Sequence, residues 1–320
     1  MTTASGATRP PTRPAIAPRD SAELAAIVRG ARRDGEALRI AGAGRWSGAG
    51  SPAGRIEVGA REVSLAAMTG IVAYVPADLT LTVRAGTTLA ELDAATAPNN
   101  QWCPLIPWGD DHGTVGATFA TATTGPCAGA LGKPRDIALG VEFVDGTGVI
   151  ARGGGRVVKN VAGFDLTRLM VGAFGSFGAI TELTVRLRAR PQVDATWLVR
   201  IPDAGVDAAA QISSLRRGVI TPIACELLAE GPARALGVTS GTVLVRYAGN
   251  ATLVAAARTA VARVGLVSDA DPELWTRFRA LDPHPRRLAD APLAHPVAAR
   301  IKERFDPERI LNRGVLGETA

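Results

Sequence analysis

The sequence predicts an α+β protein in which a ligand-binding domain is followed by a smaller α+β domain. Residues 55–97 contain short apolar strands followed by a short helix, which is typical of an α+β cofactor domain. Residues 109–188 form a glycine-rich stretch with small hydroxyl residues between the glycines. Residues 192–281 alternate strands with helices, and this alternation predicts a small ferredoxin-like domain.

The glycine-rich stretch is unsuited to bulk core packing, because Gly and Thr bury little apolar area and Gly loses much backbone entropy on ordering. It suits a backbone that must approach a ligand closely. Loops that expose bare N–H groups toward one ligand are suited to phosphate or pyrophosphate. We therefore expect a phosphate-containing ligand to lie against residues 109–188.

Composition narrows the class of protein. The chain has 320 residues, 47% of them hydrophobic and 21% charged, which allows one large or two medium domains with a sizeable core. No apolar run reaches membrane-spanning length, and residues 1–18 lack the apolar region of a signal peptide. The cysteines Cys103, Cys127 and Cys225 lack CxxC spacing, which indicates a reducing, cytoplasmic compartment and argues against an iron–sulfur or structural zinc site.

The formal net charge of +6, with a pI near 9.9, raises the question of nucleic-acid binding. The positive charge is almost all arginine spread along the chain, since the only lysines are Lys133, Lys159 and Lys302. Aromatic residues make up 4% of the chain, too few for base-stacking platforms. The charge therefore favours a ligand with two phosphates, or an acidic partner subunit, over nucleic acid.

The N-terminal part predicts a tail, a helix and a strand. Residues 1–18 are rich in Thr, Pro and Ala and are predicted to be disordered. A helix is predicted to begin at Asp20–Glu23, which resembles a capping box, and to end at Gly35. A strand over 37–41 then opens into the glycine loop 41–48, where a pyrophosphate could lie on backbone N–H groups. The alternative is an ordinary glycine turn.

Further elements are predicted along the glycine-rich stretch. Thr88 and Glu91 form a second capping box before a helix over 89–97, and 114–124 is a small-residue helix or coil. Residues 137–144 and 149–152 form a hairpin, and Asp165 caps a short helix over 166–171. Alternation of apolar and polar residues over 183–188 predicts a half-buried strand that closes the domain near 190.

Several of these motifs resemble the FAD-binding loops of the vanillyl-alcohol oxidase/PCMH flavoproteins. The motifs are Gly113–Gly116, Thr124–Pro126 and Gly132–Asp136. The runs Val157–Gly172 and Gly178–Glu182 narrow the resemblance to the glycolate oxidase and D-lactate dehydrogenase branch. Within that branch the chain is most similar to the small FAD-binding E subunit of bacterial glycolate oxidase. The resemblance covers about residues 20–190 and is weak over 191–300.

The resemblance implies a two-part PCMH-type FAD-binding domain over 19–190, a small cap over 191–296 and a C-terminal segment, 297–320, that returns to the FAD domain. Ile301–Gly314 is similar to the closing segment of the family, with Arg313 in place of the usual Pro. It also implies these cofactor-binding residues: Gly42, Ala43, Gly44, Arg45, Trp46, Gly113, Thr114, Val115, Gly116, Thr121, Thr123, Thr124, Gly125, Gly132, Asp136, Gly178 and Ile180.

Some members of the family attach FAD covalently through a His in the first glycine loop. Arg45 and Trp46 stand in that loop here, so we expect non-covalent FAD. Ala117 replaces the second Gly of the usual pair, and Ala122 replaces the usual Asn. The hydroxyl groups of Thr121, Thr123 and Thr124 could bond phosphate or ribityl oxygens, or the threonines could simply pack.

No catalytic residue is assigned. His112 is interpreted as a turn residue of an Asp-rich loop rather than a base, because no second His has a suitable spacing. Lys159 could lie near the flavin or a substrate carboxylate, or form a structural ion pair. His284 and His295 are interpreted as surface residues, and no metal site is expected.

The resemblance implies the flavin subunit of a 2-hydroxyacid dehydrogenase, in which a small 2-hydroxyacid gives up a hydride to the flavin and electrons pass onward. It also implies a larger FAD-binding subunit and an iron–sulfur subunit as partners, which would place the protein in the cytoplasm or at the inner face of the membrane. The alternatives are a non-catalytic assembly subunit with structural FAD and a stand-alone oxidase of another alcohol.

Overall fold

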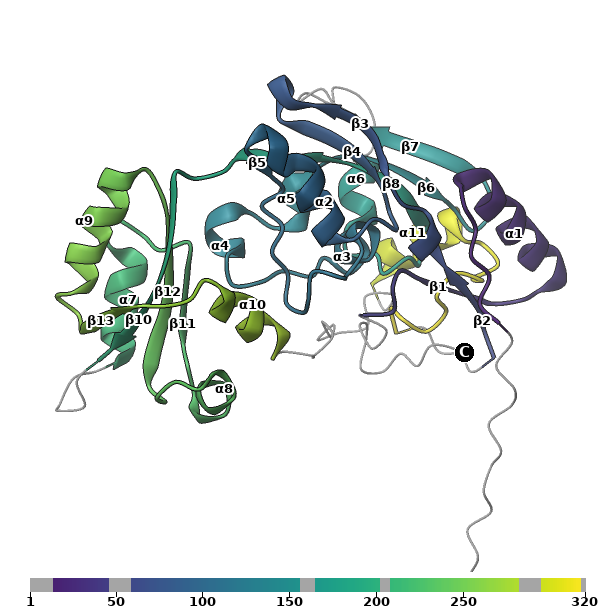
Figure 1. Cartoon of the computed structure of the whole chain (residues 1–320). Helices are drawn as coiled ribbons and strands as arrows, with labels where there is room; N and C mark the ends of the chain where they lie inside the picture. The colour runs from purple at the N-terminus through teal and green to yellow at the C-terminus, as the bar shows by residue number, and fades with distance from the viewer. Residues whose placement is uncertain (1–13, 46–58, 156–164, 202–207, 282–294, 318–320) are drawn as a thin grey trace, which may run out of the picture.

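The computed structural model describes residues 14–45, 59–155, 165–201, 208–281 and 295–317. Within these ranges the chain forms a first domain of two parts, a smaller domain at one end, called the cap, and a C-terminal segment that returns to the beginning of the chain (Figure 1). The predictions for Trp46, Lys159 and His284, and for any strand before residue 59, lie outside the described residues.

The first part of the domain is a small parallel sheet with one helix. The helix α1 (Ser21–Asp34) begins at Asp20, whose side chain accepts from the backbone N–H of Glu23, and ends at Gly35, where φ is 65°. Strand β1 (Leu38–Ala41) pairs in parallel with β2 (Arg61–Ser64). The buried residues of α1, Leu24, Ala25, Val28 and Ala31, pack against Leu38 of β1 and Val63 of β2, so one face of the predicted helix belongs to the core.

The tail prediction is wrong at its C-terminal end. Ile16 forms a parallel bridge with Val63: its N–H donates to the carbonyl of Glu62 at 2.9 Å, and its carbonyl accepts from Ser64 N–H at 2.8 Å. The sheet edge of β2 therefore orders this piece of the chain although its sequence is rich in Pro and Ala.

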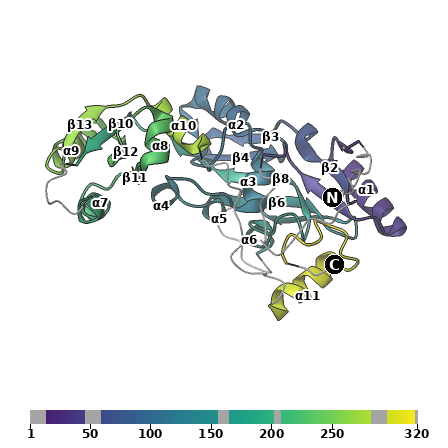
Figure 2. The same cartoon turned by 90° about the horizontal axis from the view of Figure 1, so that it is seen from below.

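The second part is an antiparallel five-stranded sheet with the order β3-β4-β8-β6-β7. Helices cover one face of it (Figures 1 and 2). The strands are β3 (Ile71–Val75), β4 (Thr80–Arg84), β6 (Ala138–Val144), β7 (Ile150–Gly154) and β8 (Ala179–Arg186). The short elements around them are η1 (Leu65–Ala67), η2 (Pro76–Asp78), α2 (Leu89–Thr96), η3 (Ala97–Asn99), α3 (Val115–Thr121), α4 (Ala128–Leu131), α5 (Pro134–Ile137), α6 (Leu166–Met170) and the paired strands β5 (Gln101–Trp102) and β9 (Arg188–Ala189).

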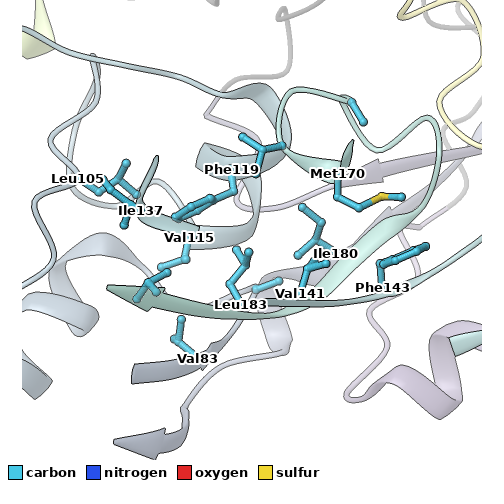
Figure 3. Close-up of a cluster of buried hydrophobic side chains, with 14 of the residues drawn as sticks. Val83, Leu105, Val115, Phe119, Ile137, Val141, Phe143, Met170, Ile180 and Leu183 are labelled. Carbon is cyan, nitrogen blue, oxygen red and sulfur yellow. The ribbon is translucent and has the colours of Figure 1, made fainter. Parts of the chain in front are cut away.

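The main core lies between this sheet and helix α3. Phe119 and Val115 of α3 point toward Leu183, Val83 and Val141 on the sheet (Figure 3). All of these side chains are buried. The alternation of apolar and polar residues predicted over 183–188 holds only in part: Leu183 and Val185 enter the core and Arg186 is exposed, but Thr184 is buried as well and β8 ends at Arg186.

The cap has a ferredoxin-like arrangement with the strand order β11-β12-β10-β13. Its elements are β10 (Val193–Arg200), α7 (Ala208–Arg217), β11 (Ala224–Leu227), α8 (Glu230–Leu236), β12 (Thr242–Gly249), α9 (Ala251–Val261), β13 (Leu266–Asp269) and α10 (Glu273–Ala280). Helices α8 and α10 and strand β13 are additions that the sequence pattern did not predict. None of the helices in the described ranges combines the length and apolar character that a bilayer crossing needs.

The C-terminal segment returns to the first part of the domain. Helix α11 (Pro296–Phe305) leads to Leu311, which forms a parallel bridge with Leu38 on the free edge of β1. The yellow segment accordingly lies near the purple N-terminal unit in both views (Figures 1 and 2). Strand β1 is thus held between β2 on one side and the end of the chain on the other.

Candidate functional site

The loop after β1 exposes backbone N–H groups. Strand β1 ends at Ala41, and Gly44 has a φ of 74°, a left-handed conformation that Gly adopts without strain. In the described part of the chain, no hydrogen bond takes up the N–H groups of Gly42, Ala43 and Gly44. Successive N–H groups of this kind form a concave site for an anion.

The loop lies directly against the N-terminus of α3. A Cβ atom on Gly42 would come within 2.3 Å of Oγ1 of Thr114, the N-cap residue of this helix. Thr114 is buried, and its hydroxyl oxygen accepts from the N–H of Ala117 at 3.3 Å. Only Gly at position 42 allows the loop to approach the helix so closely.

The first N–H groups of α3 are already engaged within the protein. Val115 N–H donates to the carbonyl of Thr87, and Gly116 N–H donates to the carbonyl of Ala85, both at 2.8 Å. A Cβ atom on Gly116 would lie 2.5 Å from Cβ of Ala85. Position 116 therefore requires Gly, because the residue that follows β4 lies directly against it. The Gly116 N–H is already hydrogen-bonded, so it is not free to bind phosphate as the glycine-rich pattern suggested.

A pocket joins the β1 loop, helix α3 and the turn after α6. Its empty space is about 830 Å³, the part open to solvent included. The lining residues come from several separate parts of the chain: Arg39–Arg45, Leu65, Ala85, the N-cap Thr114 and the α3 residues Gly116, Ala117, Ala120 and Thr121, then Phe174, Gly175, Ala179 and Ile180, and finally Asn312 and Val315. Most of these side chains are small, so the walls can approach an extended ligand along its length.

The pocket contains about half of the residues predicted from the resemblance. It is lined by Gly42, Ala43, Gly44, Arg45, Thr114, Gly116, Thr121 and Ile180. The predicted residues that do not line it are Gly113, Val115, Thr123, Thr124, Gly125, Gly132, Asp136 and Gly178.

Several residues of the second group have structural reasons for their identity. A Cβ atom on Gly125 would meet the carbonyl oxygen of Ile106 at 1.9 Å, and one on Gly178 would meet the ring of Phe143 at 2.5 Å. Gly132 has a φ of 102°, which favours Gly.

Hydrogen bonds account for two more of these residues. The carboxylate of Asp136 accepts from Lys133 N–H at 3.0 Å at the start of α5. The Thr121 and Thr123 hydroxyl groups lie 2.5 Å apart and bond each other. Thr121 Oγ1 also donates to the carbonyl of Ala117 at 2.8 Å, so these threonines are satisfied inside the fold.

Two arginines bring positive charge to the pocket. Arg39 lies on β1 and Arg45 lies in the loop, and both line the pocket. Arg45 NH1 is 3.3 Å from Oδ2 of Asp110, and both side chains are substantially exposed. Together with the free N–H groups, two guanidinium groups match the two negative charges of a pyrophosphate. The hydrogen-bond donors of the pocket, the loop N–H groups and the two guanidinium groups, therefore fit the pyrophosphate of FAD.

The C-terminal wall was not predicted as part of the site. Asn312 is buried and lines the pocket together with Val315, although Asn312 is 272 residues away from Ile40, to which it is hydrogen-bonded. The sequence signal was present, because the segment around Asn312 resembles the closing motif of the family. The local sequence pattern, however, did not indicate that this segment lies at the cofactor site.

The described residues offer no acid–base group aimed into the pocket. His112 is exposed, and its backbone N–H donates to Oδ1 of Asp110 at 3.0 Å, as expected for a turn residue. His295 caps α11, with Nδ1 accepting from Val297 N–H at 3.3 Å. In the same described ranges no cluster of His, Cys, Asp or Glu side chains could hold a metal ion.

The inner face of the cap sheet is filled by side chains. Cys127, Leu131 and the half-buried Trp102, Ile106 and Trp108 of the first domain pack against it. From the cap come Ala224, Leu228, Leu244, Leu274, Trp275 and Phe278. Burial raises the pKa of the Cys127 thiol, so this thiol stays protonated and packs as an apolar group.

Arg279 of α10 fixes the cap to the loop that carries Asp110. Its side chain is 5% exposed, and NH2 lies 2.7 Å from Oδ1 of Asp111. NH1 donates to the carbonyl of Pro107 at 3.2 Å, and its own carbonyl accepts from Gly109 N–H at 3.1 Å. The cap is therefore joined to a loop that also faces Arg45 of the pocket.

One family model and one solved structure show which known proteins the chain resembles. Residues 13–154 match the family model described as an FAD binding domain. The structure superimposes on p-cresol methylhydroxylase with a TM-score of 0.67 over 84% of this chain and 63% of that one, at 16% identity. Residues 13–154 are thus similar to an FAD-binding domain, and the fold is similar to that of p-cresol methylhydroxylase.

Sequence comparison points to particular relatives. The chain is 41% identical to glycolate oxidase subunit GlcE of Escherichia coli (strain K12) over 125 residues, which cover 38% of this chain and 35% of that protein. It is 34% identical to glycolate oxidase subunit GlcD of Bacillus subtilis (strain 168) over 152 residues, covering 47% of this chain and 32% of that protein. The matched region is thus about a third of the length of each relative.

Proposed function

We propose that this chain is the FAD-binding subunit of an FAD-dependent oxidoreductase that oxidises a small 2-hydroxyacid, in the manner of a glycolate oxidase. The observation that carries the proposal is the loop after β1, where the N–H groups of Gly42–Gly44 have no partner among the described residues and Gly42–Arg45 line a pocket whose other walls are mostly small side chains. The similarity to two glycolate oxidase subunits supports the choice of substrate class.

FAD bound there would supply the redox chemistry of the reaction. The residues of this chain would bind and orient it. The Gly42–Gly44 backbone and the arginines Arg39 and Arg45 would hold the pyrophosphate, while Ile180, Ala179 and Ala120 would give the pocket apolar walls. No His stands in the described part of the first loop, 41–45, which supports non-covalent attachment.

The first experiment tests the cofactor and its attachment. The purified full chain should carry a yellow flavin chromophore that acid precipitation releases completely into the supernatant. A flavin that stays with the protein pellet would contradict non-covalent binding. A chain that takes up no FAD on titration would overturn the proposed function.

We further propose that the chain works only together with partner flavin and iron–sulfur subunits. The filled inner face of the cap and the absence, in the described residues, of a base that lines the pocket both favour this arrangement. A 2-hydroxyacid needs a base for its hydroxyl proton and a cation for its carboxylate. Those groups would then come from a partner.

Anaerobic mixing of the FAD-loaded chain with glycolate or D-lactate tests this second part, with L-lactate as the control. We expect no bleaching of the flavin by the chain alone and prompt bleaching after partner subunits are added. Bleaching by the isolated chain would place the active site within it. Absence of bleaching in the complete assembly would favour the alternative of an assembly subunit with structural FAD.

A further inference from the structure

The side chain of Asn312 joins the two walls of the pocket. Its Oδ1 accepts from the backbone N–H of Ile40 at 2.7 Å, and its Nδ2 donates to the carbonyl of Phe174 at 2.7 Å. Nδ2 also approaches the carbonyl of Ile40 at 3.4 Å, and the Asn312 backbone N–H donates to the carbonyl of Leu38 at 2.9 Å. One residue therefore bonds to β1 and to the turn that faces it.

The facing turn is shaped to receive this amide. Gly175 has a φ of 71°, and a Cβ atom placed on it would lie 2.7 Å from Nδ2 of Asn312. Asn312 itself has a φ of 43°, a left-handed conformation that Asn tolerates better than most residues. The amide thus lies between β1 and Gly175 and contacts both.

A second contact anchors the same segment to the same turn. Lys302 Nζ donates to the carbonyl of Ser176 at 2.8 Å and to the carbonyl of Leu311 at 2.9 Å. Lys302 is buried, so these bonds are shielded from water. Lys302, Ser176 and Leu311, which do not line the pocket, therefore help to fix the position of Asn312.

We propose that Asn312 is a positioning residue of the FAD site: it sets the spacing between β1, which carries the phosphate-binding loop, and the Phe174–Gly175 turn on the opposite wall. The inference rests on the proposed FAD-binding function. It extends the site beyond residues 13–154, which match the FAD-binding family model, because the residue that fixes the spacing lies in the C-terminal segment.

Two variants test the contact between Asn312 and Gly175, one at each residue. Asn312→Gly keeps the left-handed backbone accessible and removes every side-chain hydrogen bond. Gly175→Ala pushes a methyl group against the Asn312 amide from the other wall. Gly172→Ala is the matched control for backbone strain, because Gly172 has a φ of 83° and its nearest neighbour is the Ala122 Cβ at 3.4 Å. Asn250→Gly controls for the loss of an Asn side chain far from the pocket, at the start of α9.

The affinity for FAD is titrated with the apo full chain, at a temperature where circular dichroism shows every variant folded. We expect Asn312→Gly and Gly175→Ala to weaken FAD binding by about tenfold or more, as loss of two hydrogen bonds that shape a site would do. The visible circular dichroism of the residual bound flavin should also change, because the spacing of the walls sets its orientation. Both controls should bind FAD within about twofold of wild type.

The outcomes separate the two proposals. Wild-type affinity and an unchanged flavin spectrum in both test variants would overturn the role of Asn312 and leave the FAD-binding function intact. An equal loss in the Gly172→Ala or Asn250→Gly control would also overturn it, because the effect would then follow general stability. A wild-type chain that binds no FAD would overturn the proposed function and with it the inference.

Discussion

The ammonium group of Lys302 and the carboxylate of Asp306 form a buried ion pair, with Nζ 2.7 Å from Oδ2. Both side chains are at most 1% exposed. The carboxylate also accepts from the N–H groups of Ile310 and Leu311, at 3.0 and 2.9 Å. This pair connects α11 to the strand-like end of the chain beside β1, so it holds the C-terminal wall of the pocket in place.

The first prediction concerns this pair. Lys302→Met should lower the free energy of unfolding by about 3–5 kcal/mol, because it leaves the Asp306 carboxylate buried and unpaired. Urea denaturation of the apo chain measures the change. The control is Arg32→Met, which removes an exposed pair with Glu308 and should cost less than about 1 kcal/mol. The double variant Lys302→Met/Asp306→Asn should recover part of the loss. A cost below about 1 kcal/mol for Lys302→Met would contradict the role of the pair.

A second prediction separates packing from cofactor contact at Gly116. Gly116→Ala should destabilise even the apo chain by about 1–3 kcal/mol, because its methyl group would overlap Ala85 at the end of β4. Thermal unfolding without FAD measures the effect. Gly129→Ala is the control: it also lies in a short helix, has no neighbour within 4 Å, and should be neutral or slightly stabilising. Equal melting temperatures for the Gly116→Ala variant and wild type would show that β4 can move aside.

The third prediction uses the pair formed by Arg45 and Asp110. Arg45→Gln should weaken FAD binding by about two- to tenfold, since it removes a guanidinium group from the pocket. Asp110→Asn should strengthen binding by a smaller factor, because the carboxylate 3.3 Å from Arg45 competes with a phosphate for the same cation. Titration at low and high ionic strength provides the check. Both differences should shrink in high salt, and salt-independent effects would contradict the electrostatic account.

The fourth prediction concerns the pH dependence of stability at two facing carboxyl groups of β6 and β8, Glu142 and Glu182. Burial alone would raise the pKa of Glu142, but hydrogen bonds from Ser21, Thr181 and Arg152 outweigh it and lower the pKa below the ordinary value of 4.5. Burial and the nearby Glu142 carboxylate raise the pKa of Glu182 above 4.5. The two groups should therefore respond to acid in opposite directions.

Glu142 stabilises the fold above pH 4.5, and this contribution is lost as pH falls through its folded pKa. Glu142→Gln should thus be destabilised at neutral pH and lose less stability on acidification than wild type. The contribution of Glu182 is full below pH 4.5 and is lost as pH rises through its folded pKa, so Glu182→Gln should be more stable than wild type at neutral pH. Urea titrations across pH 3–7 provide the measurement, roughly spanning both transitions. Parallel pH profiles for the two variants would refute the assignment.

The fifth prediction tests the anchor between the cap and the first domain. Arg279→Met should lower the free energy of unfolding by about 1–3 kcal/mol, because it removes a partly buried charged hydrogen bond to Asp111 and leaves the buried Pro107 carbonyl unpaired. Arg277→Met on the same helix is the matched control: this arginine is exposed and should cost less than about 1 kcal/mol. A similar loss in both variants would argue against a specific role for Arg279.

Local patterns predicted most of the regular structure correctly. The capping box at Thr88 and Glu91 is present, with Thr88 Oγ1 accepting from Glu91 N–H and the Glu91 carboxylate accepting from Thr88 N–H. Asp165 caps α6 as expected. Such features depend on residues a few positions apart, so the sequence contains the whole interaction. The α10 helix was missed, although Leu274 and Phe278 stand on one face of it at a spacing of four.

The glycine-rich stretch shows what a local sequence pattern cannot distinguish. Its abundance of glycine correctly indicated close backbone approach, but the neighbour at Gly116, Gly125 and Gly178 is another part of the protein in each case. Which atom lies opposite a glycine depends on how strands and helices pack. The sequence could therefore identify close approach without distinguishing a ligand from a neighbouring strand.

The sequence alone specified the α+β class, the FAD-binding resemblance and the β1 loop, because each depends on a contiguous pattern of residues. The tertiary structure alone decided the composition of the pocket walls. Asn312 meets Ile40 across 272 residues of chain, and the Lys302–Asp306 pair is buried only after α11 has docked on the first domain. Contacts of this kind form when distant segments share one core, and their partners leave no periodic signal along the chain.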